Sequence, residues 1–151
     1  MSPPFLSSTL AGANYSVNAK FAERGKDEVR RMIDVRVLVA IEDDYRIYRE
    51  VIAAGICVLR PRTEVETAPM RELEEQIERF DPQLVICSRP NTLASRRCAS
   101  WVELPLDPTR PTKICVAGRY SKRINPAIDV LIAVIDEVEQ LLLTNNDFEG
   151  C

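Results

Sequence analysis

The apolar run at residues 35–41, Val-Arg-Val-Leu-Val-Ala-Ile, constrains the fold more than any other feature of this chain. It is rich in β-branched residues and nearly continuous, whereas a strand with one face in water alternates apolar and polar side chains. Such a run predicts a strand that is covered on both faces. The chain must therefore place helices on either side of a sheet, which is the arrangement of an α/β protein.

The residues after this strand repeat the pattern of helix and strand. Helical spacing of apolar residues extends from Tyr48 to residue 59, directly behind the acidic residues 42–44. Residues 70–80 predict an amphipathic helix, which lies between a short alternating strand at 63–68 and a short apolar strand at 83–87. The order strand, helix, strand, helix, strand predicts a doubly wound parallel sheet. Its functional edge is expected at the carboxyl ends of the strands.

The second half of the chain is less regular. Residues 91–100 have room for one or two helical turns, residues 101–106 indicate a weak strand, and residues 113–117 a clear one. Residues 127–143 predict a long helix with a wide apolar stripe. We expect an α/β fold whose sheet of about five mostly parallel strands lies between two helical layers, with a shortened second half. Residues 1–33 are expected to form a flexible arm, 34–143 the domain and 144–151 a tail.

Composition limits the class of protein. The 151 residues are 46% hydrophobic and 28% charged, as expected of one domain with a buried core. No run approaches the roughly 18 apolar residues of a membrane-spanning helix, and residues 1–12 lack a basic leader. The formal net charge of −3 gives no general attraction to nucleic acid or anionic lipid. The sequence thus predicts a cytoplasmic protein without nucleic-acid or membrane partners.

Histidine is absent from the chain. Its absence excludes Ser-His-Asp and Cys-His catalytic groups and zinc sites with histidine ligands. The five cysteines are an odd number without Cys-x-x-Cys spacing, so we expect reduced thiols and no disulfide framework or zinc ribbon. No residue is predicted to be catalytic, and no cofactor is expected beyond weakly bound Mg²⁺.

Five successive segments match a known family. They are VRVLVAIEDD, YRIYREVIAAGICVLRP, TEVETA, MRELEEQIERF and DPQLVICSRP. Over about residues 35–90 they resemble the first half of a response-regulator receiver domain, which implies a flavodoxin-like fold and a role in two-component signalling. In that family an acidic pair after the first strand binds Mg²⁺, and an aspartate at the end of the third strand accepts a phosphoryl group. Asp43 and Asp44 match the pair, with Glu42 and Asp43 as the alternative register, and Ser88 falls at the phosphoacceptor position.

The serine at position 88 changes what the resemblance implies. An aspartate is both the nucleophile and a hard oxygen ligand for Mg²⁺, whereas a serine hydroxyl without a base is a poor nucleophile and a weak ligand. Phosphoryl transfer from a histidine kinase is therefore expected to fail. Residues 91–143 also depart from the family, with Arg119 where a lysine-proline pair is usual. The resemblance implies a degenerate receiver, or pseudo-receiver, that binds a protein partner in a regulatory pathway independently of phosphorylation.

Two interpretations are open for the acidic residues Glu42, Asp43 and Asp44. They are helix N-terminal acids that the helix dipole stabilises by about 0.3–1 kcal/mol each, or Asp43 and Asp44 form a weak site for Mg²⁺ or Ca²⁺. The sequence alone does not choose between them.

Basic residues are concentrated between Arg89 and Arg123, where eight of them accompany two acids. If all strands are parallel, Arg89 and Arg119 leave the sheet at the same edge as Asp43 and Asp44. They would then neutralise these acids, hold a phosphate-bearing ligand, or form a solvated basic face. The second interpretation gives an alternative function, a sensor or enzyme that binds a phosphate or a nucleotide.

The wide stripe of the last helix predicts a contact beyond the domain's own sheet. Receivers often pair through this helix, so we expect a homodimer with Val130, Val134 and Leu141 on the outer face. Cys87 ends the third strand next to Ser88 and Arg89, where a small core residue and a reactive thiol are the alternatives.

Overall fold

The computed structural model describes residues 34–92 and 100–144. These residues form a six-stranded mixed sheet in the order β3-β2-β4-β5-β6-β7. The strands are β2 (Arg36–Ala40), β3 (Glu64–Ala68), β4 (Leu84–Cys87), β5 (Ser100–Glu103), β6 (Pro111–Val116) and β7 (Arg119–Ile124). The helices are α2 (Arg46–Leu59), α3 (Leu73–Phe80) and α4 (Ile128–Leu143), with short 3₁₀ turns η2 (Asp43–Tyr45) and η3 (Met70–Glu72).

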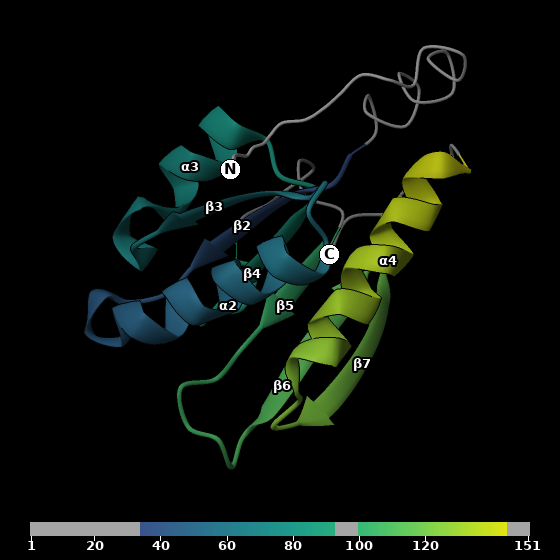
Figure 1. Cartoon of the computed structure of the whole chain (residues 1–151). Helices are drawn as coiled ribbons and strands as arrows, with labels where there is room; N and C mark the ends of the chain where they lie inside the picture. The colour runs from purple at the N-terminus through teal and green to yellow at the C-terminus, as the bar shows by residue number, and fades with distance from the viewer. Residues whose placement is uncertain (1–33, 93–99, 145–151) are drawn as a thin grey trace, which may run out of the picture. The chain divides into compact units, whose positions relative to one another are not determined.

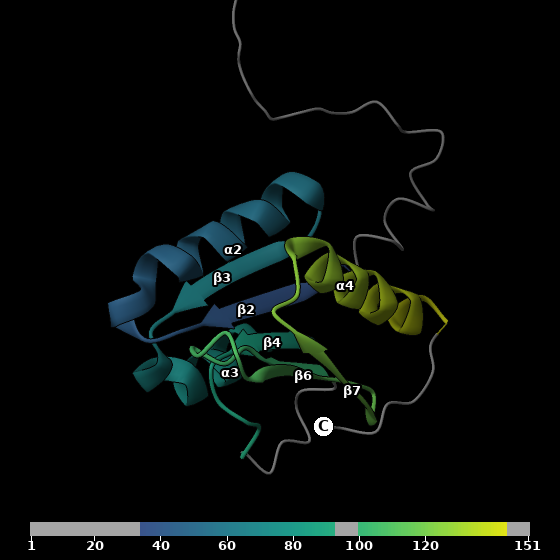
Figure 2. The same cartoon turned by 90° about the horizontal axis from the view of Figure 1, so that it is seen from below.

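Four neighbouring strands form the parallel part of the sheet. β2 pairs in parallel with β3 and with β4, and β4 pairs in parallel with β5. Helices α2 and α4 lie on one face and α3 on the other (Figure 1 and Figure 2). The prediction from residues 35–41 is confirmed, because residues 37–40 of β2 are fully buried on both faces. The α/β class is therefore correct for the described residues.

The core has one layer on each face of the sheet. The layer under α2 and α4 contains Ile56 and Ile135, and the layer under α3 contains Leu73 and Ile77. Each fully buried side chain of this size contributes about 1.5–3 kcal/mol. The stripe of α4 belongs to the first layer: Val134 is 6% exposed, and Val130 and Leu141 pack against the same cluster. The placement of Val134 on an outer face was wrong, because this residue is buried against the sheet. Val130 and Leu141 are only partly buried, and the homodimer through this helix stays a prediction.

The second half of the sheet departs from the expected topology. β6 is antiparallel to β5, and β7 is antiparallel to β6, so the described sheet is only partly parallel and has six strands instead of about five. Ala117 (φ 51°) and Gly118 (φ 83°) form a two-residue turn between β6 and β7, and positive φ at both positions is typical of tight hairpins. No sequence pattern indicated β7, because all six of its residues are exposed and show no apolar alternation.

Some expected features lie outside the described residues. These are the N-terminal arm, most of the helical turns expected at residues 91–100, and the end of the tail. Among the described helices, none has the length and the apolar content needed to cross a membrane.

Candidate functional site at the carboxyl ends of the parallel strands

Glu42 and Ser88 meet where β2 and β4 end. The parallel register places Ala40 beside Cys87, so the residues that follow the two strands lie together. Ser88 Oγ donates a hydrogen bond to Glu42 Oε1 at 2.6 Å, and Arg89 Nε lies 3.8 Å from Glu42 Oε2. The Glu42 carboxylate thus has a partner on each oxygen, and both partners come from the residues that follow β4.

The backbone after β4 is fixed by two side chains that share one acceptor. Trp101 Nε1 donates to the Arg89 carbonyl at 2.9 Å, and the Cys87 thiol donates to the same oxygen at 3.1 Å. Trp101 is 3% exposed and belongs to the core layer under α3. The position of the segment that carries Ser88 is therefore coupled to the core, and the indole directly contacts it.

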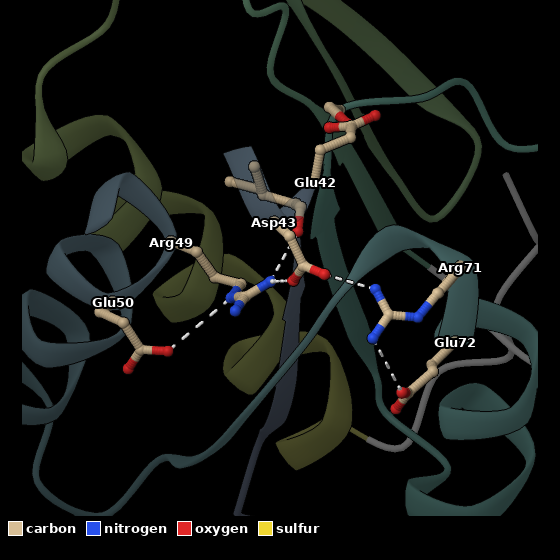
Figure 3. Close-up of polar contacts among 8 residues, drawn as sticks. Glu42, Asp43, Arg49, Glu50, Arg71 and Glu72 are labelled. Atoms are coloured by element: carbon tan, nitrogen blue, oxygen red, sulfur yellow. Dashed lines mark hydrogen bonds and ion pairs between the residues drawn. The ribbon is translucent and has the colours of Figure 1, made fainter. Parts of the chain in front are cut away.

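Asp43 lies between two arginine side chains from different elements (Figure 3). Arg49, from α2, approaches Asp43 Oδ1 with Nη1 at 3.5 Å. Arg71, from η3, donates from Nη1 to Asp43 Oδ2. The hydrogen bond from Arg71 is the main reason why the pKa of Asp43 lies below its ordinary value, and the nearby charge of Arg49 acts in the same direction. Asp43 is therefore held as a carboxylate.

Arg49 is the buried member of this group, with 7% of its side chain exposed. Its Nη1 also donates to the carbonyl of Ile41 at 2.7 Å, directly after β2. Two further acids extend the series of alternating charges, since Glu50 lies 3.7 Å from Arg49 Nε and Glu72 lies 3.9 Å from Arg71 Nη2. Arg49 thus connects the first turns of α2 to the end of β2.

The acidic residues do not converge as metal ligands. Both oxygens of Asp43 already face arginines, and Glu42 extends away from Asp43 toward the end of β4 (Figure 3). Asp44 is exposed. Within residues 34–92 and 100–144, no group of three or more histidine, cysteine or acidic side chains is arranged to hold a metal ion. A cation at Asp43 would have to displace the two guanidinium groups.

Arg119 does not join Arg89. The expectation assumed that the strand before Arg119 is parallel, but β6 runs antiparallel to β5. Arg119 therefore lies at the amino-terminal edge of the parallel strands, where it pairs with Glu137 of α4. Of Arg89 and Arg119, only Arg89 reaches one of the acidic residues, Glu42. The arginines that neutralise Asp43 are Arg49 and Arg71, which no sequence pattern indicated.

These two arginines gave little signal in the sequence. Arg49 looks like one charge in an amphipathic helix, and only the bend at η2 brings it back to Asp43, six residues earlier. Arg71 comes shortly after the end of β3, and the only indication of its role was that β3 ends at the carboxyl edge of a parallel sheet.

The structure describes three of the cysteines. Cys87 is buried and Cys57 is exposed on α2. Cys115 is disulfide-bonded, so the expectation of reduced thiols was wrong for this residue.

A groove of about 390 Å³ opens at the same edge of the sheet, between the start of α2 and the loops beside β6 and α4. Partial burial of Tyr48 raises the pKa of its hydroxyl. Among the described residues that line it, Arg110 is the only charged one. The lining residues are Tyr45, Tyr48, Leu104, Pro105, Leu106, Pro108, Arg110, Thr112, Asn125 and Pro126.

Helix α2 has an exposed apolar face. Ile47, Val51 and Val58 have 76%, 63% and 76% of their surface exposed. Their spacing of four and seven residues places them on one side of the helix, opposite the buried Ile52 and Ile56. Exposed apolar side chains that share one side of a helix are typical of interaction surfaces.

Comparisons of the chain with protein-family models, curated proteins and solved structures gave no match.

Proposed function

We propose that this chain is a pseudo-receiver, a regulatory protein-interaction domain of a cytoplasmic two-component pathway that acts without being phosphorylated. The observation that carries the proposal is the hydrogen bond from Ser88 Oγ to Glu42 Oε1. In the proposed pseudo-receiver, Ser88 takes the place of the phosphoacceptor aspartate, and its hydroxyl proton is already donated to Glu42. A serine hydroxyl carries no charge and is a weaker ligand for Mg²⁺ than a carboxylate.

The arginines around Asp43 support the same function. In an active receiver, Mg²⁺ would neutralise the acids at this edge, and the phosphoryl group would then bind the metal. Here Arg49 and Arg71 supply permanent positive charge to Asp43 without a metal. We therefore expect the strand-end loops to keep one conformation, and the receiver-like, flavodoxin-like arrangement of strands to present a constant surface.

The exposed apolar face of α2 is the surface that we assign to the protein partner. Ile47, Val51 and Val58 project from a helix whose opposite side is fixed in the core. A partner helix or sheet that covers these residues would remove apolar area from water, which is the main driving force in protein association.

The first experiment asks whether the site responds to phosphoryl donors. The full chain is incubated with acetyl phosphate and Mg²⁺, and separately with beryllofluoride and Mg²⁺. Intact mass and Trp101 fluorescence are then recorded, because the indole is bonded to the Arg89 carbonyl beside Ser88. We expect no added phosphoryl group and no saturable fluorescence change. An added group that the Ser88→Ala variant does not acquire would overturn the proposal.

The second experiment tests the partner surface. A protein captured by cross-linking to the wild-type chain should be lost from Val51→Glu and retained by Arg46→Glu, which places the same carboxylate at the exposed start of α2. Treatment with acetyl phosphate should change neither result. Capture that requires the phosphoryl donor would contradict a phosphorylation-independent function.

The groove beside α2 supports one alternative, a small-ligand sensor. Its apolar and aromatic lining with a single arginine suits a ring-containing anion such as a nucleotide or a phosphate ester. A ligand present at 100 times its dissociation constant stabilises the folded state by about 2.7 kcal/mol. Thermal shifts with ATP, GTP and glucose 6-phosphate that disappear in Arg110→Gln would favour this alternative. The absence of a shift with all three would exclude it for these ligands.

A further inference from the structure

The two edge strands of the sheet carry opposite charges. β7, Arg-Tyr-Ser-Lys-Arg-Ile, has three cations and no acid, and all six residues are exposed. β3, Glu-Val-Glu-Thr-Ala, has two acids and no cation, and both glutamates are exposed. The ion pairs of the described residues include Arg119 but neither Lys122 nor Glu66. An edge strand with free backbone groups is a template for a further strand.

The backbone groups that β7 offers can be identified from the hairpin. In a hairpin with a two-residue turn, the residues that flank the turn form a hydrogen-bonded pair, and such pairs then alternate along the strands. Val116 and Arg119 flank the turn, so the N–H and C=O groups of Tyr120, Lys122 and Ile124 point away from β6. Tyr120 borders the same groove as Trp101, which belongs to the core layer under α3. These outward residues therefore have their side chains on the α3 face.

The outward backbone groups of β3 follow from its hydrogen bonds to β2. The Glu64 N–H donates to Val35 and the Ala68 carbonyl accepts from Ile41, so alternate residues from Glu64 to Ala68 bond to the β2 side. The N–H and C=O groups of Val65 and Thr67 therefore point to the open edge. Ala68 lies in the core layer under α3, and Glu66 shares its face.

β7 and β3 can continue one sheet across two copies of the chain. β7 runs in the same direction as β3, because it is separated from the parallel strands by two antiparallel pairings. In a parallel pair, a residue with outward backbone groups bonds to the two neighbours of its opposite residue. Lys122 of one copy would thus bond to the backbone of Val65 and Thr67 of the next, with its ammonium beside Glu66 on the α3 face. Hydrogen-bond direction, side-chain face and charge agree in this register.

We propose that copies of this chain associate head to tail, with β7 of one copy pairing in parallel with β3 of the next. Pairing of two β7 edges or of two β3 edges would oppose like charges. The hairpin itself also favours an acidic neighbour. Lys113 of β6 lies between Glu103 of β5 and Lys122 of β7, so a carboxylate on the open side of Lys122 would continue the alternation of charge across the sheet. This inference does not depend on whether the protein is a pseudo-receiver.

Sedimentation velocity of the full chain tests the assembly. We expect the weight-average mass to increase with concentration at low salt and to fall toward that of the monomer in 1 M NaCl, where the Debye length is about 3 Å. Lys122→Glu and Glu66→Lys should each give monomers, and an equimolar mixture of the two should associate again. Glu78→Lys, the same change at an exposed position of α3, should behave as the wild type.

Two proline variants test the head-to-tail arrangement. Lys122→Pro and Thr67→Pro each remove an outward N–H that the folded sheet does not use, a position where edge strands tolerate proline. Each variant has one working edge, so each alone should be monomeric and their mixture should stop at a one-to-one dimer. Circular dichroism confirms that the variants are folded. A wild type that is monomeric at all concentrations, or a proline variant that dimerises alone, would overturn the proposal.

Discussion

Arg49 is expected to be the charged residue whose removal destabilises the domain most. We consider Arg49→Met, because methionine keeps an unbranched apolar stem of similar length and removes only the guanidinium. The change deletes the hydrogen bond to the Ile41 carbonyl at 2.7 Å and one of the two cations beside Asp43. Ile41 is fully buried, so water does not readily replace the lost donor.

The expected loss follows from the chemistry of that bond. A buried hydrogen bond from a charged donor contributes about 1.5–3 kcal/mol, and an acceptor left unsatisfied retains its desolvation penalty. We therefore expect Arg49→Met to lower the free energy of unfolding by about 2 kcal/mol in urea denaturation, with an unchanged m-value. Arg46→Met is the matched control, because Arg46 is exposed on the same helix; it should change stability by less than about 0.5 kcal/mol.

A second measurement separates the two arginines. In NMR titrations of the Asp43 carboxyl, Arg71→Met should raise the pKa more than Arg49→Met, because the hydrogen bond from Arg71 is the largest cause of the lowered value. Equal stability of Arg49→Met and Arg46→Met would refute the assigned role of the Ile41 bond. A larger pKa change in Arg49→Met would refute the order of the two contributions.

Three further predictions concern pH, the hairpin turn and helix α2. The pKa of Asp43 lies below its ordinary value of 3.8, so the stability that this carboxylate contributes is present above pH 3.8 and is lost as pH falls through the lowered pKa. The difference in unfolding free energy between wild type and Asp43→Asn should therefore shrink below pH 3.8. A difference that grows there would contradict the ion pairs. Ala117 has a φ of 51°, which asparagine adopts more readily, so Ala117→Asn should stabilise by about 0.5–1 kcal/mol in urea denaturation, and a loss would argue against the turn geometry. A Cβ at Gly55 would lie 3.4 Å from Ile128 Cδ1, which is ordinary contact, so Gly55→Ala should raise stability by about 0.5–1 kcal/mol through helix propensity. The bulkier Gly55→Val should instead lower the thermal midpoint. Equal effects of the two substitutions would contradict the close approach of α2 and α4.

The parallel half of the fold could be predicted because its sequence pattern has one physical solution. A β-branched run such as residues 37–40 is stable only when both faces are covered, and that condition determines the layers on either side. The hairpin could not be predicted in the same way. β7 is exposed along its whole length, so its formation depends on the turn and the backbone ladder, which leave little trace in side-chain hydrophobicity.

The candidate site was predictable only where it depends on parallel strands. Glu42 and Ser88 come together because β2 and β4 end at the same edge, as the order of elements implied. Arg119 was misplaced because one reversed strand transfers its end to the opposite edge of the sheet. Arg49 reaches Asp43 through the short η2 turn and the orientation of α2, and neither of these follows from periodicity.

The hairpin also has a consequence for how the chain folds. Only two residues separate the end of β6 from the start of β7. Each parallel pair forms only after a connection of a dozen or more residues has brought its two strands together. Loop-closure entropy increases with the length of the loop, and isolated hairpins form in about 1–10 μs. β6 and β7 can therefore pair before β2, β3 and β4 have found one another. A sheet whose strands were all joined by crossover connections would have no such local starting point for folding.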